Sequence, residues 1–229
     1  MITLEVSRQH VQEQLDARRS AAERNFLGQF ATPNLLAVEI TRYIKSVTGR
    51  HLRAVRFADP SIGTGSFYSA SLAVFGSKRM KSAVGIEFDP AFADAARDLW
   101  SGAGLDVVRG DFTRVVATGS CPPAPNVVLA NPPYVRHHHM DREDKERLQR
   151  LAFKMTGVEV NGLAGLYVYF LLLATAWMEN GGIAAWLIPS EFMDVNYGAA
   201  LKGFLTDNVT LLRAHRFDPN EVQFGDALV

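Results

Sequence analysis

The chain has 229 residues, 48% of them hydrophobic and 21% charged, so it can bury one large core and lies near the globular average. Its 24 basic and 24 acidic residues balance to zero, which gives no overall basic footprint for nucleic acid without excluding a basic face. The single cysteine, Cys121, excludes an internal disulfide and a multi-cysteine zinc site. No charged and apolar leader opens the chain and no apolar stretch is long enough to span a bilayer, so we expect a soluble, cytoplasmic protein.

The chain opens with a polar, helix-favouring segment over residues 7–24. We therefore expect a helical prelude at residues 1–25 and one larger domain at residues 26–229. Thr32 followed by Pro33 is a good N-cap and first-turn pair, which predicts a helix that runs to about Lys45. Because a helix start also binds anions, the same end could hold a cofactor carboxylate.

Short apolar runs then alternate with longer amphipathic segments, the pattern typical of an α/β domain. The expected strands lie at residues 54–58, 83–87, 105–108, 126–130, 183–188 and 209–216. The expected helices lie at residues 66–75, 90–100, 163–178 and 197–206. The pattern predicts a Rossmann-like fold with a mostly parallel sheet and helices on both faces.

A glycine turn follows the first predicted strand, with the sequence Asp-Pro-Ser-Ile-Gly-Thr-Gly-Ser-Phe at residues 59–67. Gly63 and Gly65 permit a tight turn and let a ligand approach the backbone closely, but the third glycine of the dinucleotide fingerprint is missing. A carboxylate at Asp59 would repel a pyrophosphate and attract the cationic amine of a methionine moiety. These features favour S-adenosylmethionine over NAD as the cofactor.

Acidic residues also end the next two predicted strands. Glu87 lies 24 positions after Gly63, close to the spacing at which an acidic residue meets ribose hydroxyls. Phe88 could then cover an adenine ring, and the carboxylate of Asp111, which precedes Phe112, could accept from the adenine amine. A single carboxylate of this kind is usually just solvated, but three at the ends of consecutive strands predict one cofactor site.

The sequence Asn-Pro-Pro-Tyr at residues 131–134 directly follows the apolar run 127–130. Two prolines cannot continue a strand, so the chain must turn out at the edge of the sheet where ligands bind. Asn131 Oδ1 and the Pro132 carbonyl could accept both hydrogens of a planar exocyclic amine, and Tyr134 could stack on the base. The alternative is a proline-rich turn with a half-buried tyrosine.

The ordered set of these motifs resembles the N6-adenine DNA methyltransferases of restriction–modification systems, in their gamma arrangement. The motifs are Phe-Ala-Thr-Pro at 30–33, the turn at 59–67, Gly-Ile-Glu-Phe-Asp-Pro at 85–90, Gly-Asp-Phe at 110–112 and Asn-Pro-Pro-Tyr-Val-Arg at 131–136. The match runs from about Phe26 to the end of the chain. It implies an S-adenosylmethionine-dependent enzyme of the bacterial cytoplasm and nucleoid that methylates a flipped-out adenine in double-stranded DNA directly, without a covalent enzyme intermediate, and so protects host DNA.

The resemblance also assigns roles to single residues. Those implied to surround the cofactor are Thr32, Pro33, Asp59, Pro60, Gly63, Gly65, Glu87, Phe88, Asp111 and Phe112. Those implied to hold the target adenine are Asn131, Pro132 and Tyr134, with Phe224 stacked against the base and Phe217 as a competitor for that place. Leu-Tyr-Val-Tyr-Phe at 166–170 matches the family helix behind the catalytic loop, or forms an aromatic core stripe.

Two departures from the family pattern affect the expected partners. The resemblance predicts a further strand near Ala227 and then a target-recognition domain, yet the sequence stops at Val229. Either the chain is a catalytic-domain fragment or a separate specificity chain supplies recognition. There is also no room before Phe26 for a nuclease domain, so we expect that this polypeptide does not cut DNA.

Three further features bear on function. The histidines at 137–139 are consecutive, whereas a chelating pair on a helix needs i and i+4 spacing, so we expect no metal. The interleaved charges at 141–150 predict a solvated helix face instead of a dedicated DNA surface. Methyltransferases of release-factor glutamine or of ribosomal RNA guanine N2 share the Asn-Pro-Pro-Tyr loop and remain alternatives, as does a cofactor-binding subunit of a larger complex.

Overall fold

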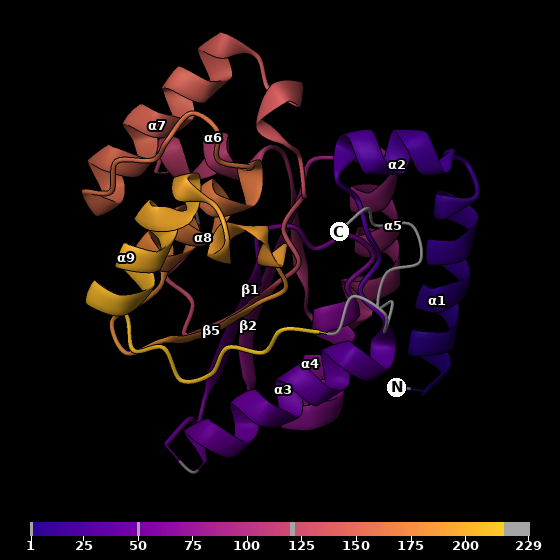
Figure 1. The fold of residues 1–229 in the computed structure, drawn as a ribbon. Coiled ribbons are helices and arrows are strands. Elements are labelled where there is room, and N and C mark those ends of the chain that lie inside the picture. Colours follow the sequence, from indigo (N-terminus) through magenta and orange to yellow (C-terminus); the bar gives the residue numbers. More distant parts are fainter. Residues whose placement is uncertain (1, 50, 120–121, 218–229) are drawn as a thin grey trace. The chain divides into compact units, whose positions relative to one another are not determined.

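The fold contains a parallel sheet of five strands (Figure 1). Its strands are β1 (Val55–Asp59), β2 (Met80–Glu87), β3 (Asp106–Arg109), β4 (Val127–Ala130) and β5 (Ile183–Trp186). They lie in the order β3-β2-β1-β4-β5, and every neighbouring pair is parallel. The strand order reverses between β1 and β4, so the carboxyl ends of these two strands mark the switch point at which ligands bind in open α/β sheets.

The computed structural model describes residues 2–49, 51–119 and 122–217. Within this part the chain divides into two units. The first contains the sheet and comprises residues up to Ser20, Ala31–Asn131 and Trp177–Leu187. The second comprises Ala21–Phe30, Pro132–Ala176 and the described residues after Leu187.

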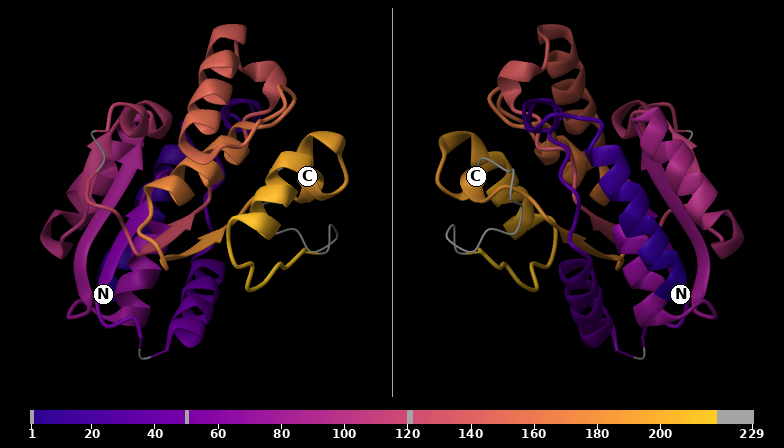
Figure 2. Two further views of the ribbon diagram at one scale, coloured as in Figure 1. Left: turned by 90° about the vertical axis from the view of Figure 1, so that its left-hand side faces the viewer. Right: turned by 90° about the vertical axis from the view of Figure 1, so that its right-hand side faces the viewer.

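The helices of the first unit are α1 (Ile2–Asp16), α3 (Asn34–Thr48), α4 (Ser66–Phe75), α5 (Pro90–Trp100) and α6 (Phe112–Ala117), with a short 3-10 turn η1 (Ser101–Ala103). α4 packs against β1, β2 and α3, and α5 packs against β2 and β3. α1 lies beside α5 (Figure 2). Beneath the start of α4, the rings of Phe57, Tyr68 and Trp100 form an aromatic part of the core, with Tyr68 and Trp100 edge to face at 5.3 Å.

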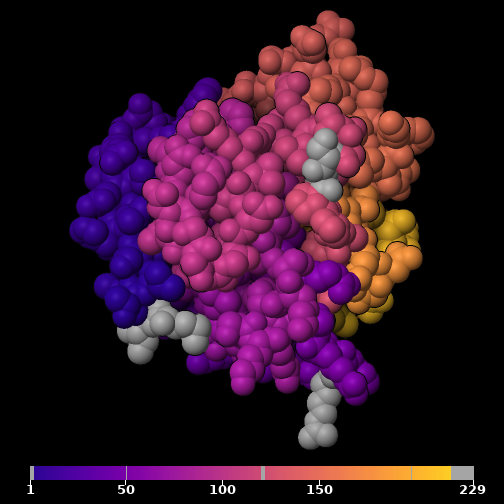
Figure 3. Space-filling model, turned by 180° about the vertical axis from the view of Figure 1, so that it is seen from behind, coloured from indigo at the N-terminus to yellow at the C-terminus, as the bar shows by residue number. Residues whose placement is uncertain are grey.

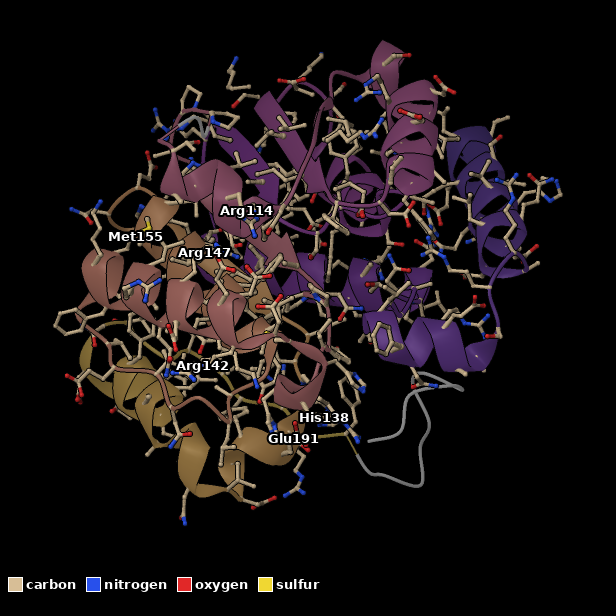
Figure 4. All side chains as sticks on the ribbon, turned by 90° about the horizontal axis from the view of Figure 1, so that it is seen from above. Arg114, His138, Arg142, Arg147, Met155 and Glu191 are labelled. Carbon is tan, nitrogen blue, oxygen red and sulfur yellow. The ribbon has the colours of Figure 1, made fainter. Side chains whose placement is uncertain are left out.

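The second unit is mainly helical. Its elements are α2 (Ala21–Leu27), η2 (His137–His139), α7 (Arg142–Thr156), α8 (Leu166–Trp177), η3 (Ser190–Met193), η4 (Asn196–Gly198) and α9 (Ala199–Asp207), the last residue of α8 counting with the first unit. Arg142 and Arg147 extend from α7 (Figure 4) and pair with Glu146 and Asp144 of the same helix. The helix predicted around residues 141–150 is therefore confirmed, and its charges pair along the helix surface.

The structure confirms the Rossmann-like α/β fold and five of the six predicted strands. The sixth prediction is wrong, because residues 209–216 are described and carry no strand. Leu211 and Leu212 are about half exposed there, and within the part of the chain that the structure describes no strand pairs with this segment to supply the backbone partners that a strand requires. α6 was not predicted. Among the described helices, none combines the length and apolar composition needed to cross a bilayer.

The predicted N-cap at Thr32 is also wrong. α3 begins one residue later, with Pro33 at the N-cap position and no side-chain cap. The Thr32 hydroxyl accepts a hydrogen bond from Asn131 instead, at 3.2 Å. A long-range partner has therefore replaced the local cap.

Candidate functional site

The glycine turn after β1 is closely packed at Gly65 and open at Gly63. Gly65 has φ 92°, and a Cβ there would lie 2.4 Å from Trp100 Nε1, so only glycine fits. Trp100 Nε1 donates to the Thr64 carbonyl at 2.8 Å. Gly63 has φ 54°, and a Cβ at this position would meet nothing within 4 Å. A ligand could thus approach the backbone at Gly63, as predicted for a cofactor turn.

Asp59 ends β1 beneath this turn and is 3% exposed. Its Oδ1 accepts from the Ser61 backbone at 2.9 Å and from Ser61 Oγ at 3.3 Å. Burial raises the pKa of Asp59 to about 8; the hydrogen bonds from Ser61 oppose this effect and the carboxylate of Glu87 adds to it. At a pH below this value the Asp59 carboxyl holds a proton. A cation placed against Asp59 would favour the ionised carboxylate and so the loss of that proton.

Glu87 ends β2, and both of its carboxylate oxygens accept hydrogen bonds from backbone amides. Oε2 accepts from Gly63 N at 2.9 Å and Oε1 accepts from Asp89 N at 2.8 Å. Burial raises the pKa of Glu87, although these backbone hydrogen bonds lower it. Phe88 beside it is 72% exposed, which suits a ring that covers a ligand. The role of Asp89 as the N-cap of α5 was missed, although Asp before Pro90 is a recognisable helix start.

Asp111 and Phe112 lie at the end of β3 and the start of α6. Asp111 caps α6, accepting from Thr113 N and Oγ1 at 2.8 Å. The Phe112 ring is 1% exposed and packs against Trp177, with centroids 5.9 Å apart. The assignment of Phe112 to the cofactor site stays a prediction.

Asn131 follows β4 and is the last residue of the segment Ala31–Asn131 of the first unit. Its Nδ2 donates to Thr32 Oγ1 at 3.2 Å, and its carbonyl accepts from Ser61 Oγ at 3.0 Å. The Thr32 carbonyl in turn accepts from Ser66 Oγ at 3.1 Å. Asn131, Thr32 and the glycine turn, which come from three distant parts of the sequence, therefore meet at the carboxyl edge of the sheet.

The rest of the Asn-Pro-Pro-Tyr loop belongs to the second unit, where Gly28 contacts it. Tyr134 N donates to the Gly28 carbonyl at 3.0 Å, and the rings of Tyr134 and Phe30 lie 5.4 Å apart. Gly28 has φ 62°, and a Cβ there would lie 2.4 Å from Tyr134 N. Burial raises the pKa of the Tyr134 hydroxyl. Sequence reasoning missed Gly28, although a glycine directly after α2 is a signal of a positive φ.

The remaining predicted site residues lie in different environments. Pro33 is exposed at the start of α3, whereas Pro60 and Pro132 are buried. Tyr167 and Tyr169 on α8 are almost fully buried, as the core-stripe interpretation requires. Phe224 lies outside the described residues.

The three histidines form the turn η2, where the rings of His138 and His139 pack edge to face at 4.2 Å. Within the described ranges, no three His, Cys, Asp or Glu side chains gather in a way that could hold a metal ion.

Comparison with known proteins supports the predicted resemblance. Residues 126–223 match the Eco57I restriction-modification methylase family. Type II methyltransferase M.XamI of Xanthomonas campestris pv. amaranthicola is 31% identical over 74% of this chain and 32% of its own length. Type II methyltransferase M.AccI of Acinetobacter calcoaceticus is 26% identical over 91% of this chain and 36% of its own length. The chain thus spans about a third of the length of these relatives.

A similar solved structure is the methyltransferase subunit of a type I restriction-modification system from Streptococcus thermophilus. Its TM-score is 0.59 at 18% identity, and the match covers 77% of this chain and 38% of that one. Together with the strand order, this likeness confirms the fold of S-adenosylmethionine-dependent methyltransferases. The sequence matches confirm the resemblance to restriction–modification methyltransferases, and fold and family both support S-adenosylmethionine as the cofactor.

Proposed function

We propose that this chain is the catalytic part of a DNA adenine-N6 methyltransferase. The observation that carries the proposal is the position of Asn131: its side chain lies at the carboxyl end of β4, hydrogen-bonded to Thr32, and its carbonyl is bonded to Ser61 of the cofactor turn. An amide that can accept from an amine is thereby held beside the turn that would hold the methyl donor. The restriction–modification relatives support DNA as the substrate. The resemblance of the Asn-Pro-Pro-Tyr loop to that of the N6-adenine methyltransferases supports adenine as the bearer of that amine.

The first unit suits S-adenosylmethionine in three respects. Gly63 leaves its backbone open to a ligand, Phe88 exposes a ring, and Asp59 is a buried carboxyl whose negative form a methionine amine would stabilise. When bound, the cofactor supplies a methyl group on a positively charged sulfonium. Glu87, which is already tied to the turn, would help to fix the ribose from its place at the end of β2.

In the proposed mechanism the loop prepares the target amine for attack. An exocyclic amine is a poor nucleophile, because its lone pair is delocalised into the ring. If Asn131 Oδ1 and the Pro132 carbonyl accept its two hydrogens, the lone pair would become localised and could attack the methyl group directly. The new N–C bond would form as the methyl–sulfur bond breaks, leaving neutral S-adenosylhomocysteine, and the methylated amine would then lose one hydrogen as a proton to solvent. Tyr134 stacks on the flipped-out base and replaces stacking lost from the duplex, worth about 1–3 kcal/mol. We place Phe224 as a second stacking residue.

The proposed substrate is double-stranded DNA, and the proposed biological role is protection of host DNA. Because the chain spans about a third of its relatives, we assign selection of the DNA sequence to a further domain or a separate specificity chain. Residues 26–229 form the catalytic domain in this proposal, and the protein acts in the cytoplasm at the nucleoid.

The Asn131→Ala variant tests the mechanism. Loss of one directed acceptor at the reacting amine should raise the barrier by about 2.7–4 kcal/mol, by analogy with an oxyanion-hole donor. Methyl transfer to unmethylated bacterial DNA should therefore fall at least a hundredfold, while calorimetry should show cofactor affinity nearly unchanged. Asn208→Ala, at the exposed end of α9, is the matched control. Equal transfer by Asn131→Ala and the control would remove Asn131 from the mechanism.

A further inference from the structure

The N-terminal segment belongs to the same unit as the predicted cofactor site, although the family resemblance begins only at about Phe26. Residues up to Ser20 cluster with the sheet, and α1 packs along α5. Figure 3 shows the indigo surface of the N-terminal segment against the magenta surface that includes α5. This segment was expected to be a separate helical prelude, so its contacts with the cofactor turn need a physical reason.

The first contact is made by Arg8, whose guanidinium is buried on α1. The residue is 3% exposed, and arginine is rarely so buried unless it is paired. Its Nε and Nη2 donate to the carboxylate of Glu5 at 2.9 and 2.7 Å. Its Nη1 donates to Thr64 Oγ1 at 3.0 Å, and Thr64 lies between the two glycines of the turn. The guanidinium of α1 is thus hydrogen-bonded to the residue at the centre of the turn.

The direction of this hydrogen-bond chain is fixed by chemistry. A guanidinium can only donate, so the Thr64 hydroxyl accepts from Arg8 and gives its own hydrogen to Gln12 Oε1, 2.7 Å away. Gln12 Nε2 then donates to both carboxylate oxygens of Asp16 at 3.0 Å. Since the Thr64 carbonyl accepts from Trp100, this residue is held through its side chain and its backbone together.

The second contact is made by Arg19 at the next loop of the same sheet edge. Arg19 forms an ion pair with Asp89 and lies 5.6 Å from the centroid of the Phe92 ring. The Asp89 amide donates to Glu87, the residue proposed to fix the ribose. The N-terminal segment therefore holds the loops that follow β1 and β2, and both of these loops face the proposed cofactor.

We propose that residues 2–20 are a structural brace of the cofactor site that acts through Arg8 and Arg19, and that Arg8 is a positioning residue that acts through Thr64. The inference rests on the proposed use of S-adenosylmethionine. Glycines give the turn more conformational freedom than any other residues, so an ordered turn costs entropy when the cofactor binds. The Arg8–Thr64–Gln12 chain restricts the turn beforehand, and preorganisation of this kind increases affinity.

The test compares Arg8→Ala, Thr64→Val and the double variant with wild type. Thr64→Val removes the hydroxyl at nearly constant volume, which keeps the test usable if Arg8→Ala folds poorly. Arg18→Ala removes the same type of side chain from an exposed position and is the matched control. Binding of S-adenosylmethionine and S-adenosylhomocysteine is measured by calorimetry, and amide hydrogen exchange of residues 61–66 is measured without ligand.

We expect each single variant to bind S-adenosylhomocysteine about tenfold more weakly, equal to about 1.4 kcal/mol. The double variant should lose little more than either single variant, because both remove the same chain. Exchange at residues 61–66 should become faster. Arg18→Ala should change neither quantity.

Two results would overturn the inference for different reasons. If wild type binds the cofactor and Arg8→Ala and Thr64→Val bind it equally well, the N-terminal segment only adds stability, and the brace is refuted while the proposed function stands. If wild type binds neither cofactor form, the proposed function fails and the inference fails with it.

Discussion

Replacing Asp59 by asparagine should remove the part of the pH dependence of folding stability that Asp59 contributes. Burial raises the pKa of Asp59 from its ordinary value of 3.8 to about 8. Between these values the folded chain keeps a proton that the unfolded chain has lost. The stabilising contribution is therefore complete below the ordinary pKa and is lost as the pH rises through about 8.

The size of the effect follows from proton linkage. While the folded state holds one extra proton, the free energy of unfolding falls by about 1.4 kcal/mol per pH unit. Over the whole interval the upper limit is roughly 6 kcal/mol. Burial shifts the pKa of Glu87 in the same direction, so the variant keeps part of the slope after Asp59 is replaced. The asparagine side chain still offers an oxygen to Ser61 but has no proton to lose, so the difference between the two chains isolates Asp59.

The assay is urea unfolding at several pH values from about 5 to about 8, with an exposed acidic residue on α5 replaced as the control in Asp98→Asn. Asp59→Asn should gain stability relative to wild type as the pH rises, whereas Asp98→Asn should run parallel to wild type. Parallel curves for Asp59→Asn and wild type would refute the assignment of a protonated, buried Asp59.

Two further substitutions test other parts of the site. Gly28→Ala should destabilise the chain by roughly 2 kcal/mol or more, because φ is positive and the new Cβ would lie 2.4 Å from Tyr134 N. The control is Gly203→Ala in α9, where a Cβ meets nothing within 4 Å and the substitution should instead stabilise the chain by about 0.5–1 kcal/mol. Thermal unfolding compares the two variants. Equal effects on stability would contradict the close contact between Gly28 and Tyr134. Phe88→Ala should weaken cofactor binding by about 1–3 kcal/mol, the range for aromatic stacking, without lowering the unfolding temperature. Phe153→Ala, a similarly exposed ring on α7, should leave calorimetric affinity unchanged, and no loss on Phe88→Ala would exclude the ring from the cofactor site.

The strands and the glycine turn could be predicted because their signals are local. An apolar run of four residues marked β4, and the positive φ at Gly63 and Gly65 is what the tight strand-to-helix turn after β1 requires. The failures involve distant partners. Threonine is a residue type that favours the N-cap position, but the Thr32 hydroxyl accepts a hydrogen bond from Asn131, 99 positions away.

The burial of Arg8 shows the same limit. The polar sequence of residues 7–24 predicts only a helical prelude, and only the folded chain brings Thr64, 56 positions after Arg8, against the guanidinium. Residues 209–216 alternate enough to suggest a strand, yet a strand exists only when a neighbouring strand satisfies its backbone. Local pattern therefore located the candidate site, while the contacts that hold it together depend on the tertiary fold.

The most direct measurement follows tritium from labelled S-adenosylmethionine into unmethylated bacterial DNA, total RNA and a glutamine-bearing protein fraction in parallel, with digestion to identify the labelled product. The account predicts label in N6-methyladenine from DNA, at a low rate and without marked sequence selection for this chain alone. Label in guanine of RNA, in glutamine of protein or in another base of DNA would contradict it.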